Sequence, residues 1–250
     1  MPILADSLFW TFAPKLLGAG VLAIFVTVIA YIHDPRLKML VFSMPVPFTC
    51  AYLVTGVTID STALSGVVLV TAYHWIVYVI AVVWGLPLAL GIGVSVGTYI
   101  ATAWLTKDFI KPIPIMYSAV VVIFLLGLVS YLYKPIVEDG HRSRSPWYVK
   151  LPLIYVIAVG IYSITSLLAG AVTTFPYAGV FTSYEMRRSL RTLAGQYTIN
   201  NFSFLAMFLA IAMGEHLAWP KPLPLAAGWA AIIITIWTIY YFEWGKPKAA

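Results

Sequence analysis

Long apolar runs separated by short polar segments dominate the chain. A helix needs about 20 apolar residues to cross roughly 30 Å of hydrocarbon. Runs close to that length occupy residues 16–32, 39–57, 64–84, 86–105, 115–132, 190–213 and 225–242. Each run therefore predicts a membrane-spanning helix, and the first of them could begin as early as Leu8.

The stretch 151–184 has 34 residues and no charged side chain. A single helix of that length would extend about 51 Å, which is too long for the bilayer. Two short helices with a turn near residues 163–166 fit better. This interpretation brings the expected number of spans to nine.

The basic residues test the count of nine, because cytoplasmic loops carry an excess of Lys and Arg. Nine spans place eleven of the 15 basic residues on one face: Arg36, Lys38, Lys134, Arg142, Arg144, Lys150, Arg187, Arg188, Arg191, Lys246 and Lys248. Lys107, Lys111 and Lys221 fall on the other face, and Lys15 joins them where the first span begins at residue 16. An eight-span arrangement moves the arginines at 187–191 across the membrane and removes this bias. We therefore expect the N-terminus outside and the C-terminus in the cytoplasm.

Several features recur in the same order in the two parts of the chain. LPLALG at residues 86–91 opens the fourth expected span, and LPLAAG at 223–228 opens the ninth. Each follows a long span, which in turn follows a proline-bearing one. The expected organisation is a four-helix repeat at 1–106, a linker helix and cytoplasmic loop at 107–149, and a second four-helix repeat at 150–250. The alternative is that these two short sequences match by chance, because the chain consists largely of a few apolar residue types.

A single linker helix between two four-helix units gives the second unit the opposite orientation in the membrane. Such inverted-topology repeats are common among transporters. The fold class expected from the sequence is therefore all-α. It is a polytopic transmembrane bundle of about nine spans, arranged as four plus a linker plus four in an inverted-topology repeat.

Short motifs in both halves resemble the GlpM-like family of small bacterial inner-membrane proteins. They are KLLGA at residues 15–19, the Leu86-Pro87 helix that ends in AWL at 103–105, and Ala169-Gly170 followed by Phe175-Pro176. The resemblance implies a fused tandem pair of such units in a bacterial inner membrane, and it supplies an architecture more than an activity. The chain departs from that pattern in its double length and in its PVP sequence at 45–47.

Composition excludes a soluble globular protein. Hydrophobic residues make up 62% of the chain and charged residues 10%, whereas soluble domains carry about 25% charged residues. One cysteine, Cys50, allows no intrachain disulfide. The net charge of +6 suits basic cytoplasmic loops and requires no nucleic acid. The expected partners are membrane lipids, and protein partners in the membrane or a second copy are possible.

Polar residues inside spans are costly and therefore informative. An offset of 126 between the halves aligns His74 with Asn200, and both lie near the middle of an expected span. Asn201, Gln196 and Tyr73 lie beside them. These five residues are the candidate substrate site, on a polar path at the repeat interface. The alternative is hydrogen bonding between helices, worth about 0.6–2 kcal/mol per contact.

Prolines and arginines supply further candidates. Pro45, Pro47 and Pro176 are candidate helix breaks, where exposed backbone groups could bind a solute; ordinary kinks are the alternative. Arg187, Arg188 and Arg191 are candidate ligands for lipid phosphate. The alternative is that these arginines only set the orientation of the chain in the membrane.

Motifs for chemistry are missing from the sequence. No carboxylate lies firmly within an expected span, no phosphate-binding loop occurs, and no spacing suits a metal or a cofactor. We therefore expect no enzyme activity, no cofactor and no metal. Two functions remain open, a transporter or lipid or small-molecule carrier and a non-catalytic membrane subunit that scaffolds a larger complex.

Overall fold

The computed structural model describes residues 2–56, 58–133, 138, 146–163, 169–220 and 222–244, and all regular structure within them is helical. The long helices are α1 (Pro2–Ala30), α4 (Ser61–Tyr78), α5 (Leu88–Ile110), α6 (Ile115–Leu132), α9 (Leu190–His216) and α10 (Leu223–Trp244). A π-helical turn, η1 (Val79–Val83), extends α4. The shorter elements are α2 (Pro35–Phe42), α3 (Val46–Thr55), α7 (Trp147–Ser163), the 3-10 helix η3 (Ala169–Thr174) and α8 (Tyr177–Glu185).

Six helices are long and apolar enough to cross a membrane: α1, α4 with η1, α5, α6, α9 and α10. Shorter apolar helical stretches occupy Leu40–Leu53 and Trp147–Gly160. This is the pattern of a multi-pass membrane protein, as the sequence predicted.

Two expected spans are interrupted. The predicted span 39–57 is two helices, because α2 ends at Phe42 and α3 begins at Val46 after Pro45. Later in the chain, η3 ends at Thr174 and α8 begins after Pro176. Proline fits at the start of a helix, whereas inside a helix it removes one backbone hydrogen bond and clashes with the preceding turn. The predicted turn at 163–166 begins where α7 ends, and its residues 164–166 lie outside the described residues.

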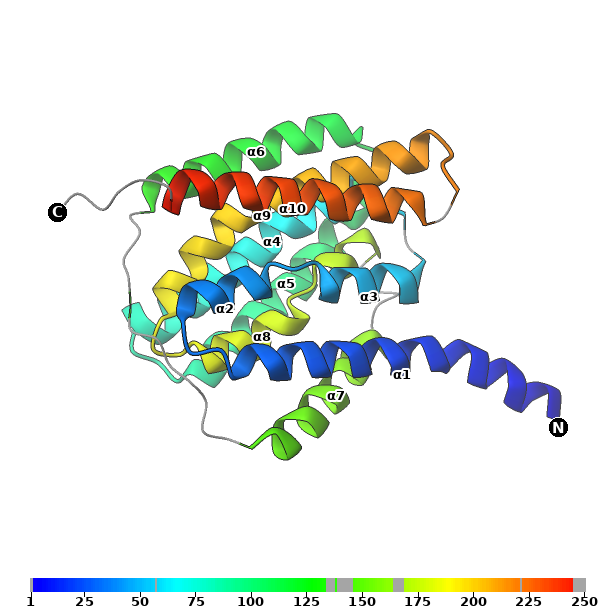
Figure 1. Ribbon diagram of the computed structural model, residues 1–250, viewed down its shortest axis with the longest axis horizontal. Helices are drawn as coiled ribbons and strands as arrows, with labels where there is room; N and C mark the ends of the chain where they lie inside the picture. The colour runs from blue at the N-terminus through cyan, green and yellow to red at the C-terminus, as the bar shows by residue number, and fades with distance from the viewer. Residues whose placement is uncertain are drawn as a thin grey trace.

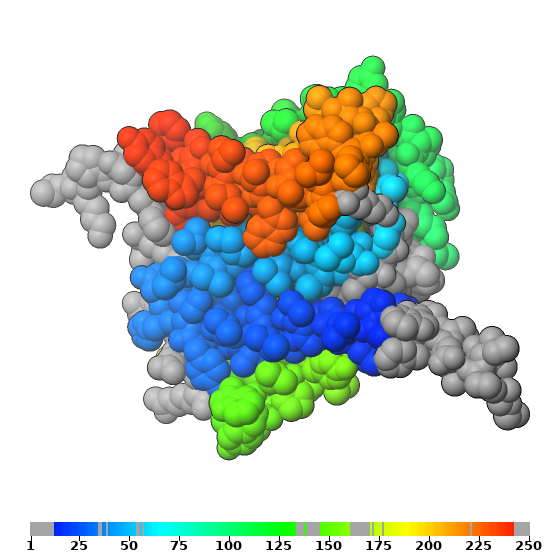
Figure 2. Space-filling model, turned by 45° about the vertical axis from the view of Figure 1, so that its right-hand side comes forward, coloured from blue at the N-terminus to red at the C-terminus, as the bar shows by residue number. Residues whose placement is uncertain are grey.

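The two central helices are α4 and α9. They pack on each other, α4 also packs on α5, α6 and η3, and α9 also packs on α10 and α6. In Figure 1, α6 and α10 lie along one edge of the molecule and α1 and α7 along the opposite edge. Figure 2 shows the same order on one face, with α10 above, α1 to α3 between, and α7 below. Most polar side chains on α4 and α9 are therefore buried between helices.

One glycine on α4 permits a very close approach to η3. A Cβ atom added to Gly66 would lie 1.8 Å from Thr174 Oγ1 and 3.1 Å from Tyr99 Oη. Small residues let membrane helices approach closely, which increases van der Waals contact where no hydrophobic effect drives association. Gly66 thereby fixes the position of the second helix break against α4.

Candidate functional site

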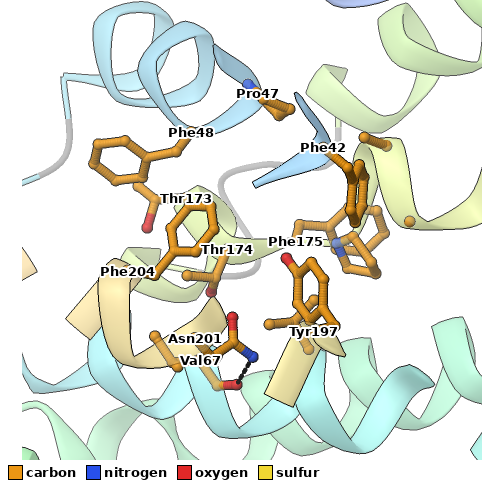
Figure 3. Close-up of a pocket in the computed structure, with 14 residues that line it drawn as sticks. Phe42, Pro47, Phe48, Val67, Thr173, Thr174, Phe175, Tyr197, Asn201 and Phe204 are labelled. Carbon is orange, nitrogen blue, oxygen red and sulfur yellow. Dashed lines mark hydrogen bonds between the residues drawn. The ribbon is translucent and has the colours of Figure 1, made fainter. Parts of the chain in front are cut away.

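A small cavity lies where the two interrupted spans meet α4 and α9 (Figure 3). Its volume is about 30 Å³, which is room for about two water molecules. The lining residues are Phe42, Pro47, Phe48, Val67, Val70, Thr173, Thr174, Phe175, Pro176, Ala178, Gly179, Tyr197, Asn201 and Phe204. All of them have uncharged side chains.

Both helix breaks present their ends to this cavity. Phe42 is the last residue of α2, Pro47 lies in the first turn of α3, and Thr174 and Pro176 flank the second break. The last carbonyls and the first N–H groups of a helix have no partner within that helix. The helix ends at both breaks therefore lie beside the cavity.

Asn201 supplies the amide of the cavity wall. It is 1% exposed on α9, and its Nδ2 donates to Thr71 Oγ1 at 2.6 Å. The same Nδ2 lies 3.5 Å from the Val67 carbonyl oxygen on α4. In Figure 3 the amide oxygen points away from Val67, toward the side of Thr174. The bonds to α4 fix the amide so that an acceptor faces the cavity.

His74 lies behind the wall that Tyr197 forms. The two rings are stacked at 4.1 Å between centroids with a 32° tilt. Since Nδ1 lies 2.8 Å from the Val70 carbonyl oxygen, Nδ1 donates and Nε2 is left as an acceptor. Nε2 is buried with no hydrogen-bond partner among the described residues. A Cβ atom added to Gly179 would lie 3.2 Å from it.

The other three candidate residues do not line the cavity. Asn200 is 2% exposed and its Nδ2 donates to Ser43 Oγ in the α2–α3 break. The Tyr73 hydroxyl lies 3.3 Å from Ser183 Oγ on α8. Gln196 is half-buried, and its Oε1 has no partner in the part of the chain that the structure describes. Asn200 and Tyr73 therefore each connect a central helix to one of the interrupted spans.

Sequence reasoning missed the hydroxyl groups of the second break. Thr173 and Thr174 line the cavity, and Tyr99 on α5 holds this segment by donating to the Ala171 carbonyl oxygen at 2.7 Å. The Tyr99 hydroxyl also lies 2.9 Å from Thr174 Oγ1. The signal available in the sequence was the pair of threonines directly before Phe175-Pro176.

The arginine cluster lies at the junction of α8 and α9 and takes no part in the cavity lining. Arg187 and Arg188 are exposed and Arg191 is half-buried. Arg187 donates to the Tyr184 carbonyl oxygen at 3.2 Å and lies 5.0 Å above the Tyr184 ring.

A buried ion pair lies near this junction. Lys150 Nζ on α7 is 2.8 Å from Glu185 Oε1 at the end of α8, and both residues are less than 10% exposed. Lys38 of α2, 1% exposed, interacts electrostatically with both charges. From the sequence, Lys150 and Lys38 are expected only to mark the cytoplasmic face.

The described residues hold no group of three His, Cys, Asp or Glu side chains placed to bind a metal ion. Comparison of the chain with protein-family models, with curated proteins and with solved structures finds no match. The resemblance to GlpM-like proteins therefore stays a prediction, and the geometry of the site carries the functional argument.

Proposed function

We propose that this protein is a membrane carrier for a small polar solute, which binds in the cavity between the two helix breaks. The observation that carries the proposal is the convergence of both breaks and both central helices on one small cavity. Discontinuous helices near the middle of the membrane are typical of transporter substrate sites. Asn201, Thr173 and Thr174 would supply its side-chain hydrogen bonds, and an uncharged lining favours a neutral solute.

We further propose that the two units form the inverted repeat. The order of elements supports it, because α1, α2–α3, α4 and α5 are followed, after α6, by α7, η3–α8, α9 and α10. In each unit the third member packs on the fourth, and the third members pack on each other across the molecule. The cavity would then lie near the axis that relates the units.

Membrane orientation belongs to the same proposal. Counting each interrupted pair and α7 as crossings gives nine, which places the start of α1 and the end of α10 on opposite faces. Figure 1 shows these two helix ends at opposite ends of the long axis, in agreement with an odd number. We propose a bacterial inner-membrane location with the C-terminus cytoplasmic, and the GlpM-like resemblance supports a fused tandem origin.

A scaffolding subunit is the second candidate function. Hydrogen bonds that only connect helices favour it: Trp75 Nε1 donates to Thr198 Oγ1 at 3.0 Å, and Trp229 Nε1 donates to Thr49 Oγ1 at 3.0 Å. A scaffold keeps its central cavity sealed, whereas a carrier opens it to each side of the membrane in turn. Accessibility of the cavity therefore distinguishes the two functions.

The test places a cysteine at Thr173 in a protein whose Cys50 is replaced by alanine. Thr173 is 3% exposed, so a charged methanethiosulfonate reaches a cysteine there only when the cavity opens. We expect modification from each side in right-side-out and inverted vesicles. The matched control is Ala63→Cys, at a fully buried α4 position outside the cavity, which should stay unmodified. Protection of the Thr173→Cys protein on both sides would favour the scaffold.

A further inference from the structure

The two halves of the first interrupted span lead away from the cavity in opposite directions. Phe42, the last residue of α2, and Phe48, in the first turn of α3, both line the cavity. Figure 1 shows α2 toward the end of the molecule where α10 ends, and α3 toward the end where α1 begins. In the proposed orientation, α2 therefore lies between the cavity and the cytoplasm, and α3 between the cavity and the outside.

A buried charge cluster lies one helical turn from the cavity on the α2 side. Lys38 precedes Phe42 by four residues, so the two side chains share a face of α2. Lys38 is attracted by Glu185, the last residue of α8, and repelled by Lys150 of α7. Lys150 itself is paired with Glu185, and all three side chains are buried. One carboxylate on α8 thus attracts cations on both α2 and α7.

On the α3 side, a hydrogen bond to a carboxylate has the corresponding place. Tyr52 follows Phe48 by four residues, and their rings stack at 5.7 Å between centroids with a 23° tilt. Tyr52 Oη donates to Glu215 Oε1, near the end of α9, at 2.6 Å. The backbone N–H of Ile59, in the segment after α3, donates to Glu215 Oε2 at 3.1 Å. Glu215 thereby holds α3 to α9 by hydrogen bonds to a charged group, which are the stronger kind.

We propose that α2 and α3 are the inner and outer gates of the cavity, and that the Lys38–Glu185–Lys150 cluster and the Tyr52–Glu215 hydrogen bond hold them shut. The inference rests on the proposed carrier function, because a carrier opens its site to each side in turn. Each gate has an aromatic ring at the cavity and, one turn farther out, a polar side chain that interacts with a carboxylate on a later helix. The two sets of contacts share no residue, so one gate can open while the other stays closed.

The test measures how fast a charged methanethiosulfonate modifies Thr173→Cys in right-side-out and in inverted vesicles, with Cys50 replaced by alanine. Glu185→Gln leaves two buried lysines without their carboxylate, so the rate from the cytoplasmic side should rise at least about tenfold. Tyr52→Phe removes only the hydroxyl donor, so the rate from the outside should rise about threefold to tenfold. Neither variant should raise the rate from the other side, and each is therefore a control for its counterpart.

A milder variant tests the inner gate without breaking the ion pair. Lys38→Met leaves Lys150 and Glu185 paired, so the fold should be retained, and it should raise the same cytoplasmic rate as Glu185→Gln. Asp108→Asn is the matched control for the loss of a carboxylate. Asp108 is exposed on α5 and does not line the cavity, so its substitution should change neither rate.

A second cysteine position distinguishes the opening of a gate from a general loosening of the bundle. Ala63→Cys should stay unmodified in each gate variant. If Thr173→Cys is accessible but the gate variants leave both rates unchanged, or raise both rates together, the gates are overturned and the carrier proposal stands. Protection of Thr173→Cys on both sides in every variant would overturn both proposals.

Discussion

Asn200 and Asn201 are adjacent on α9, yet their amides have different surroundings. Successive residues on a helix point about 100° apart. The Asn200 amide reaches Ser43 in the first helix break, whereas the Asn201 amide is held by Thr71 and lines the cavity. One side chain thus connects helices, and its neighbour also presents an acceptor to the cavity.

This difference predicts unequal effects of the same substitution. Asn200→Leu and Asn201→Leu should each cost about 1 kcal/mol of stability, because each loses one interhelical hydrogen bond. Asn201→Leu should in addition abolish uptake of small polar solutes, while Asn200→Leu should retain it. The measurements are uptake of a panel of labelled neutral solutes into proteoliposomes and thermal unfolding in detergent. Unchanged uptake with the Asn201→Leu protein would contradict the proposed site.

Buried polar residues such as His74 and the two asparagines could be identified from the sequence, because a polar group in a span requires a partner. Which of them faces the cavity could not be predicted. That depends on the rotation of α9 about its axis, which packing against α4 and α10 determines. The ring of Tyr197 also separates His74 from the cavity, and no spacing in the sequence indicates this.

At the scale of elements, the contact between α4 and η3 depends on the absence of a side chain at Gly66. An alanine there would displace Thr174 Oγ1, which accompanies Tyr99 in holding the second break. The position of the break, and with it one wall of the cavity, follows from this single glycine.

Gly66→Ala should therefore destabilise the protein by about 1–3 kcal/mol, the usual cost of overpacking a well-packed site. Gly97→Ala is the control, because Gly97 lies in α5 with no atom within 4 Å of its would-be Cβ. This control should be neutral or more stable, since alanine is favoured over glycine in a helix by about 1 kcal/mol. Thermal unfolding in detergent measures both. Similar unfolding temperatures for the two variants would show that the close approach is unimportant.

Hydropathy predicted the long helices well, and α6 has the predicted limits 115–132. The interrupted elements were harder to predict. The span expected at 39–57 contains Pro45 and Pro47, but only the structure shows that helix α2 ends at Phe42 before them. Whether a membrane helix bends or breaks at a proline depends on neighbours that replace the lost hydrogen bonds.

At the scale of the whole molecule, nine crossings require the end of α5 and the beginning of α9 to lie on opposite sides of the membrane. Lys111→Cys should react with an impermeant maleimide from outside, and Arg188→Cys only from the cytoplasm, again with Cys50 replaced. Both original side chains are exposed, so labelling reports sidedness rather than burial. Labelling of both from the same side would exclude nine crossings and the inverted repeat.

The ion pair between Lys150 and Glu185 has a consequence for how the chain enters the membrane. A helix of 17 residues such as α7 spans only about 25 Å, less than the hydrocarbon thickness. Its Lys150 charge is neutralised by a carboxylate that is synthesised 35 residues later. We therefore expect α7 to become stable in the bilayer only after Glu185 of α8 has been synthesised. We expect α7 and α8 to enter the membrane together rather than one after the other.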